Sequence, residues 1–155
     1  MDKTCCFIGH RTIEENEELK EQLLKTVERL ICEQGVDTFL FGSKSGFDTL
    51  CLDLVSQIKE RYPHIKRVYM RAEYPDIGEE YKRYLLQGYE DTFYPQKIRG
   101  AGKSVYVERN YQMIDSSRYC IFYYDIRCLP TNRKSGAEIA LEYARRKKKE
   151  IICFP

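Results

Sequence analysis

The sequence predicts a Rossmann-like α/β fold, in which a doubly wound, mostly parallel sheet carries helices on both faces within one domain over residues 1–155. Two patterns support this prediction. Strand-sized segments alternate with amphipathic helical patterns from end to end of the chain. The strand segments are also apolar throughout, as in a sheet that is covered on both faces. A length of 155 residues fits one domain and leaves little room for a second.

The first elements are a strand, a helix and a second strand. Lys3–Ile8 is a short apolar segment that stops at Gly9. Glu14–Gln34 carries apolar residues at three- and four-residue spacing, which predicts an amphipathic helix, and Gly35 is a typical residue to close it. Asp37–Phe41 then reads as the second strand.

The middle of the chain is less regular. We expect a helix over Phe47–Tyr62, because its apolar residues fall on one face and Pro63 stops it. Ile65–Met70 is predicted to be a strand. The segment Arg71–Lys103 is rich in glycine and proline and gives the weakest pattern. Within it we expect a helix near Glu79–Leu86 and a short strand near Thr92–Tyr94.

The last third returns to clear alternation. Ser104–Ser117 is predicted to be a helix and Tyr119–Tyr124 a strongly apolar strand. Asp125–Lys134 is expected to be a loop, Gly136–Lys148 a helix and Glu150–Phe154 the final strand.

Composition excludes several classes of protein. No apolar stretch approaches the ~20 residues of a membrane helix, and none follows a basic N-terminus as in a signal peptide, so we expect a cytoplasmic protein that does not enter a membrane. The 26 Lys and Arg residues nearly balance the 24 Asp and Glu residues, which does not favour nucleic acid as a partner. The basic run at 145–149 is interpreted as the solvated end of a helix. Seven cysteines, an odd number, indicate reduced thiols, and their spacing predicts no metal site.

In a sheet of this kind ligands bind at the carboxyl ends of the strands, so the loops there are where a site is expected. The first loop contains Gly9, His10 and Arg11. Glycine permits a close backbone approach, arginine suits a phosphate or carboxylate, and histidine can hydrogen-bond a ligand or transfer a proton. A tight turn with a solvated arginine explains the same residues, and this alternative stays open.

The second loop joins the strand ending at Phe41 to the next helix, and it contains Gly42, Ser43, Gly46 and Asp48. Small residues at the start of a helix expose backbone N–H groups that favour an anion. Asp48 is either an ordinary first-turn acid or an acceptor for a ribose hydroxyl.

The third loop opens the last helix with Ser135 and Gly136, which repeats the logic of the second loop. Two anion sites on the same rim would suit a ligand with a phosphate, such as a nucleotide. Glu138 is a candidate catalytic group that could act at the anomeric carbon of a sugar. An ordinary negative charge at the start of a helix is the simpler interpretation of Glu138.

A further cluster, Arg109, Asn110 and Asp115, lies in the helix before the strand Tyr119–Tyr124. Asn110 could contact a ribose or a base edge, whereas Asp115 could instead cap the helix or form an ion pair. The chain also has 13 tyrosines, many of them between residues 69 and 111. They could stack a base, although packing at the edge of the core explains most of them.

Together these segments resemble the YpsA-like branch of the SLOG superfamily, which includes Smf/DprA and LOG relatives. The string from Lys3 to Arg11 resembles the opening Lys-Thr-Cys-Cys-Phe-Thr-Gly-His-Arg of that branch. The remaining matches are to Gly-Gly-Ala-x-Gly-x-Asp, to Arg-Asn-x-x-Met-x-Asp and to a late Gly-Gly-Thr helix start followed by Tyr-Ala, and the matching residues here are Gly42, Gly46, Asp48, Arg109, Asn110, Met113, Asp115, Gly136, Tyr143 and Ala144. Ser43, Ser135 and Ala137 depart from the pattern, and Ala137 removes an expected phosphate donor.

The resemblance implies a domain that binds a nucleotide or nucleotide derivative, such as ADP-ribose or a nucleoside phosphate, and by analogy a homo-oligomer. No cofactor or catalytic set is firmly implied, so we interpret the chain first as a sensor or regulatory module. One alternative is an enzyme that cleaves the N-glycosidic bond of a nucleotide, as LOG-type phosphoribohydrolases do. The glutamate of their motif corresponds to Ala140 here, which leaves Glu138 as a substitute. A module that binds single-stranded DNA, as DprA relatives do, is the other alternative.

Overall fold

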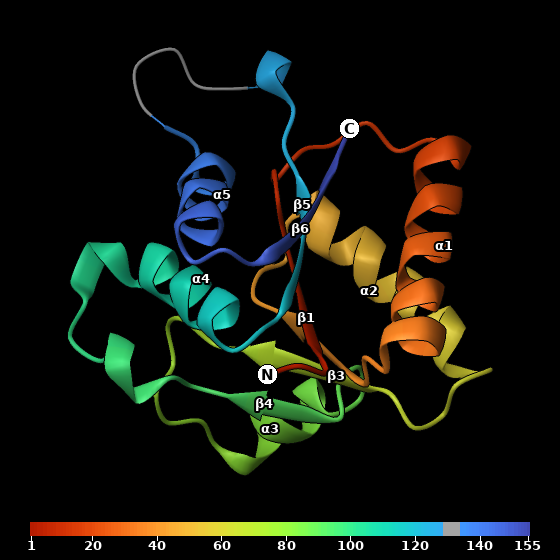
Figure 1. Cartoon of the computed structure of the whole chain (residues 1–155). Helices are drawn as coiled ribbons and strands as arrows, with labels where there is room; N and C mark the ends of the chain where they lie inside the picture. The colour runs from red at the N-terminus through yellow and green to blue at the C-terminus, as the bar shows by residue number, and fades with distance from the viewer. Residues whose placement is uncertain (129–133) are drawn as a thin grey trace.

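A six-stranded sheet in which every neighbouring pair of strands is parallel runs through the centre of the molecule in the computed structural model, which describes residues 1–128 and 134–155 (Figure 1). The strands are β1 (Thr4–Gly9), β2 (Thr38–Phe41), β3 (Lys66–Met70), β4 (Asp91–Phe93), β5 (Tyr119–Tyr123) and β6 (Glu150–Phe154). Their order across the sheet is β4-β3-β2-β1-β5-β6. The predicted Rossmann-like fold is thereby confirmed.

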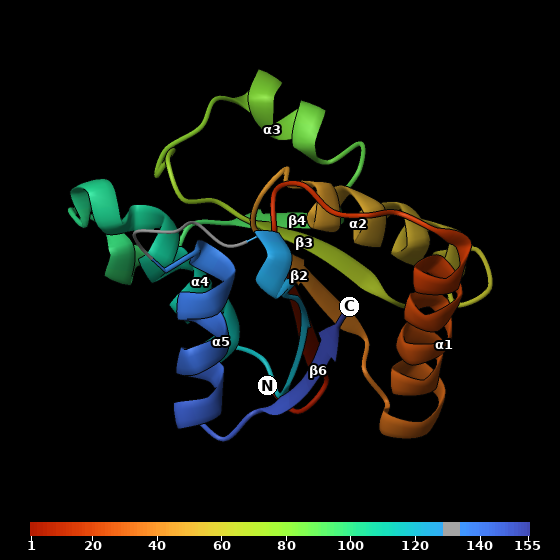
Figure 2. The same cartoon turned by 90° about the horizontal axis from the view of Figure 1, so that it is seen from above.

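Helices cover both faces of this sheet (Figure 2). The helices are α1 (Glu17–Gln34), α2 (Gly46–Lys59), α3 (Glu79–Leu85), α4 (Val105–Asp115) and α5 (Gly136–Arg146). Helices α1 and α2 pack on one face and α4 and α5 on the other, while the short α3 lies beside β4. No helix in the described part of the chain is long and apolar enough to cross a membrane.

The apolar strands explain the two cores. Successive side chains of a strand point to opposite faces, so Cys5 and Phe7 enter the core under α1 and α2, whereas Cys6 and Ile8 enter the core under α4 and α5. All four of these residues are buried. A strand buried on both faces has no position for a polar side chain, which is why the sequence pattern is continuous rather than alternating.

Local signals set the ends of the elements. Helix α1 begins later than predicted, at Glu17, because the side chain of Asn16 accepts a hydrogen bond from the N–H of Leu19 at 2.8 Å. It ends where predicted, at Gly35, which has a left-handed φ of 70°. The loop predicted over Asp125–Lys134 contains a short 3₁₀ turn at Ile126–Cys128, and its residues 129–133 lie outside the described residues.

The order of the strands places a crevice beside β1. From β1 the chain builds the sheet outward through β2, β3 and β4, and it then returns to the other side of β1 to add β5 and β6. The direction of winding therefore reverses between β1 and β5. Loops on the two sides of such a switch point diverge, and they leave a ligand-sized opening at the carboxyl ends of the strands.

We expect Gly9→Ala to destabilise the fold. A Cβ atom on Gly9, the last residue of β1, would lie 2.5–2.7 Å from the Cδ2, Cγ and Cβ atoms of Phe47 at the start of α2. Overpacking of this kind costs about 1–3 kcal/mol of unfolding free energy, which urea denaturation can measure. Gly88→Ala is the matched control, because a Cβ there meets no atom within 4 Å. Equal stabilities of the two variants would contradict the close packing of β1 on α2.

Candidate functional site

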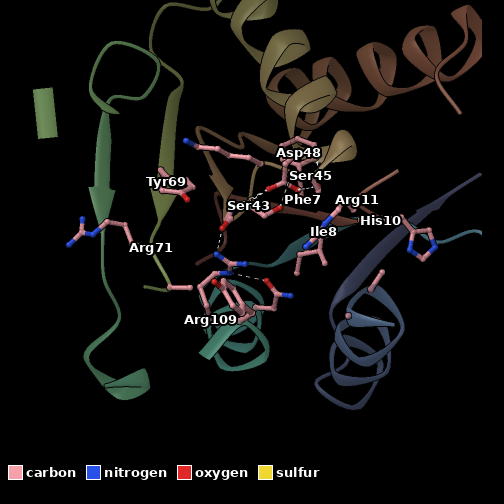
Figure 3. Close-up of a pocket in the computed structure, with 18 of the residues that line it drawn as sticks. Phe7, Ile8, His10, Arg11, Ser43, Ser45, Asp48, Tyr69, Arg71 and Arg109 are labelled. Atoms are coloured by element: carbon pink, nitrogen blue, oxygen red, sulfur yellow. Dashed lines mark hydrogen bonds between the residues drawn. The ribbon is translucent and has the colours of Figure 1, made fainter. Parts of the chain in front are cut away.

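A cleft of about 970 Å³ opens at the carboxyl ends of β1, β2 and β3 (Figure 3). It is lined by the loops after these strands, by the first two turns of α4 and by the start of α5. Every predicted ligand-binding residue except Gly46 and Asp115 lines it, and these lining residues are Gly9, His10, Arg11, Gly42, Ser43, Asp48, Arg109, Asn110, Ser135 and Gly136. Residues from four distant parts of the sequence therefore share one cavity, at the edge of the sheet where a site was expected.

The two remaining residues and Glu138 lie elsewhere. Gly46 packs against the backbone of Arg11, and its N–H donates to the Arg11 carbonyl at 2.7 Å. The carboxylate of Asp115 accepts hydrogen bonds from the Tyr143 hydroxyl at 2.8 and 3.0 Å. The carboxylate of Glu138 accepts one from Tyr124 at 2.9 Å, and Glu138 is not among the residues that line the cleft.

The two glycines of the second loop make room for the protein itself rather than for a ligand. A Cβ on Gly42 would lie 2.5 Å from the sulfur of Met113 and 2.8 Å from Nε of Arg109. A Cβ on Gly46 would lie 2.7 Å from the Arg11 carbonyl oxygen. The glycine pattern of the second loop is therefore required by the packing of β2 against α4 and of α2 against the first loop.

Asp48 holds the second loop together. The residue is 4% exposed, and Oδ2 of its carboxylate accepts hydrogen bonds from the N–H groups of Gly42 at 3.2 Å and Ser43 at 2.9 Å. The Ser45 hydroxyl donates to Oδ1 at 3.3 Å and also accepts from the Asp48 N–H, which caps α2. Burial raises the pKa of Asp48, while the hydrogen bonds from the loop act to lower it. The second loop was expected to present backbone N–H groups to an anion, but two of these groups are bound by the protein's own carboxylate.

Arg109 is the most buried cation of the cleft, at 4% exposed. Its Nη1 donates to the carbonyls of Gly42 and Met70, and its Nε donates to the side-chain oxygen of Asn110 at 3.0 Å. These acceptors are all neutral, and among the described residues no carboxylate lies within ion-pair distance of Arg109. Burial lowers the pKa of Arg109, although the more distant charges of Asp48 and Glu73 act to raise it.

The chain after β3 supplies the part of the cleft that the sequence did not predict. Arg71, Glu73, Tyr74 and Tyr81 line it together with Tyr69 of β3 itself. The buried Arg71 guanidinium donates to the carbonyl of Tyr74 at 2.9 Å, to that of Pro75 at 3.3 Å and to the hydroxyl of Thr92 at 3.0 Å, which fixes the loop. The abundance of tyrosine was the only sequence signal for this wall.

His10 is neutral and links the two sides of the switch point. Its Nε2 accepts a hydrogen bond from the N–H of Asp125 at 2.9 Å, directly beyond the end of β5. An accepting Nε2 means that the proton is on Nδ1. Burial lowers the pKa of His10 from 6.5, whereas Asp125 acts to raise it.

The charge of the cleft is positive. Its lining includes four cations, Arg11, Lys44, Arg71 and Arg109, against the two carboxylates Asp48 and Glu73. In the described part of the chain the Arg11 guanidinium has neither an ion-pair nor a hydrogen-bond partner, and Lys44 lies over the ring of Tyr84 at 5.8 Å. Four tyrosines, Tyr69, Tyr74, Tyr81 and Tyr106, line the same cavity. The arrangement suits a ligand that has both an anionic group and a flat ring.

Comparison with known families supports the resemblance found in the sequence. The family model YpsA, described as the YspA SLOG family, matches residues 9–154. No curated protein matches the chain.

We expect Asp48→Ala to lower the free energy of unfolding by about 1–3 kcal/mol, because the buried N–H groups of Gly42 and Ser43 lose their acceptor. Asp53→Ala is the matched control, since Asp53 is an exposed acid of the same helix. Urea denaturation measures both variants. An Asp48→Ala protein as stable as the control would show that the carboxylate does not hold the loop.

We also expect His10 to titrate below 6.5. The unfolded state then binds more protons than the folded state, so the contribution of His10 to stability is present above pH 6.5 and is lost as the pH falls through its folded pKa. NMR titration of ¹⁵N-labelled histidine gives the midpoint and the tautomer. His64→Gln assigns the signals, because the chain has 2 histidines. A His10 midpoint at or above 6.5 would contradict the neutral, buried imidazole.

Proposed function

The chain belongs to the YspA SLOG family, and we propose that it binds a nucleotide-derived ligand, as a sensor or regulatory module, in the cleft at the carboxyl ends of β1, β2 and β3. One observation carries the proposal. The cavity at the switch point of the sheet combines an excess of cations with a wall of tyrosines. Its volume of about 970 Å³ is at the upper end of the range for small-molecule sites, so it has room for a whole nucleotide.

The phosphate would lie between Arg11 and the start of α5. The first N–H groups of a helix have no intrahelical acceptor and stand at the positive end of its dipole. At α5 these belong to Gly136 and Ala137, both of which line the cleft, while the third N–H, that of Glu138, is already bound by the Ser135 hydroxyl at 3.1 Å. Arg11 faces the same cavity with its fork of donors.

The start of α2 is less suited to this role. The Gly46 N–H donates to the Arg11 carbonyl, and the Asp48 N–H donates to the Ser45 hydroxyl. The carboxylate of Asp48 also adds a negative charge directly beside this helix start. We therefore assign the phosphate to α5 rather than to α2.

The base would stack on the tyrosine wall at the other end of the cleft. Tyr69 lies near the end of β3 and Tyr81 comes from α3. Tyr106 lies in the first turn of α4, with its ring centroid 5.9 Å from Cζ of Arg109. Stacking on tyrosine contributes about 1–3 kcal/mol per base and tolerates any base. The amide nitrogen of Asn110 is left to bind a ribose hydroxyl, since the oxygen of this side chain already accepts from Arg109.

Glu138 gives the hydrolase alternative little support. Its carboxylate is hydrogen-bonded to Tyr124 and lies outside the cavity, so it would not reach a sugar bound there. Of the two carboxylates that line the cleft, Asp48 is committed to the second loop, whose N–H groups it binds. We therefore keep binding without turnover as the proposal. The homo-oligomer expected from the resemblance stays a prediction.

The proposal is tested by thermal shift and calorimetry with AMP and ADP-ribose, with adenosine as the probe that has no phosphate. A ligand that binds only the native state raises the melting temperature by mass action. We expect AMP and ADP-ribose to raise it and adenosine to raise it less. Arg11→Gln should weaken AMP binding about tenfold, because one charge-assisted contact to phosphate is lost.

Arg118→Gln is the matched control for this experiment. Arg118 is an exposed arginine that precedes β5, at the opposite edge of the sheet from the cleft. It should bind AMP as the unchanged protein does. Failure of both nucleotides to shift the melting temperature, or equal losses in the two arginine variants, would refute the proposed site.

A further inference from the structure

One nitrogen of the Arg109 guanidinium makes no hydrogen bond within the described part of the protein. Nη1 and Nε are occupied by the carbonyls of Gly42 and Met70 and by the side chain of Asn110, whereas Nη2 has no acceptor among the described residues. Every fully buried side-chain nitrogen and oxygen in the described part of the chain does have a partner. Nη2 therefore remains accessible, and it is accessible from the cleft, because Arg109 lines the cleft and is otherwise buried.

No carboxylate of the site neutralises this charge directly. Asp48 is the nearest candidate, but its oxygens accept from Gly42, Ser43 and Ser45, and the Gly42 peptide stands between Asp48 and Arg109. Glu73 is exposed and lies beyond ion-pair distance. A cation withdrawn from water without an ion-pair partner is costly, and an anion brought by a ligand would offset that cost.

Arg109 also lies well apart from the phosphate position at α5. Its guanidinium binds the carbonyls at the ends of β2 and β3, and in Figure 3 it projects from α4 toward Ser43. Helix α5 instead packs over β1 and β5. Two strand spacings separate these positions, or roughly 10 Å. Hydrogen bonds of about 2.8 Å at each end leave roughly 4–5 Å between the bound anionic oxygens, which two phosphoryl groups cover and one does not.

We propose that Arg109 forms a second anion subsite and that the ligand of this cleft carries two phosphoryl groups, one at Arg11 and the start of α5 and the other at Nη2 of Arg109. This inference rests on the proposed function and narrows its ligand class. Both a nucleoside diphosphate and a nucleoside 3′,5′-bisphosphate have the required chemistry. Asn110 orients the guanidinium through Nε and so keeps Nη2 directed at the ligand.

The test compares dissociation constants for AMP, ADP and adenosine 3′,5′-bisphosphate by calorimetry. The unchanged protein should bind ADP or the bisphosphate about 10- to 100-fold more tightly than AMP, since a charge-assisted contact is added. The two doubly phosphorylated probes show which spacing the site accepts. Removal of Arg109 itself would expose the carbonyls that it binds, so a variant with a smaller effect on the fold is required.

Asn110→Asp is that variant. It keeps the size of the side chain and the acceptor for Nε, and it places a negative charge on the guanidinium next to the Nη2 position of the second phosphoryl group. The preference for the doubly phosphorylated probe over AMP should then disappear. Gln112→Glu makes the same amide-to-acid change on the same helix, at a position that does not line the cleft, and should leave the preference intact.

The outcomes separate this inference from the proposed function. Equal affinities for AMP, ADP and the bisphosphate in the unchanged protein would overturn the second subsite while leaving nucleotide binding in place. A preference that survives Asn110→Asp would overturn the role of Arg109. No binding of any of the three probes would overturn both the proposed function and the inference that rests on it.

Discussion

The peptide group that joins Gly42 to Ser43 is the point on which the site depends. Its N–H, that of Ser43, donates to the buried carboxylate of Asp48, and its carbonyl, that of Gly42, accepts from the buried guanidinium of Arg109. One peptide thus lies between two opposite charges that are not in contact, and it connects β2 with both α2 and α4. Because a side chain at position 42 would collide with Met113 and Arg109, this connection requires glycine. The geometry of the cleft floor follows from these hydrogen bonds.

The starts of α2 and α5 have different roles because of this network. Asp48 binds the N–H groups of the second loop, so the start of α2 serves the fold. At α5 the corresponding acid, Glu138, turns to Tyr124 and leaves the first turn facing the cleft. Both helices have a serine cap and an acid three residues later, but the two acids point in different directions, and at α2 the Gly46 N–H also donates to the Arg11 carbonyl.

The same difference between the two helix starts marks the limit of what could be predicted from the sequence. The strands and helices were predictable because each strand is apolar on both faces and each helix has a clear stop or cap. The gathering of Gly9, Gly42 and Ser135 in one cleft followed from the rule for switch points. The direction of Asp48 and Glu138 could not be predicted, since a first-turn acid has the same pattern whether it binds backbone or a tyrosine. The wall after β3 was missed because its segment has no periodicity.

The position of Asp115 away from the cleft could have been predicted from the sequence. It lies six residues after Arg109, which in a helix is about 240° around the axis, so the two cannot share a face. Met113, four residues after Arg109, does share its face, and both residues pack against Gly42.

The arginines near the two ends of β3 differ in whether a carboxylate of the protein neutralises their charge. At the amino end, Arg67 donates to both oxygens of Glu90 at 3.0 and 2.7 Å, and its charge is neutralised within the protein. At the carboxyl end, Arg71 and Arg109 are buried, yet their hydrogen bonds go to carbonyl, amide and hydroxyl oxygens. Neutral acceptors fix a guanidinium in place without cancelling its charge. Positive potential is therefore concentrated where the strands end, and an anionic ligand would complete the electrostatics of the fold.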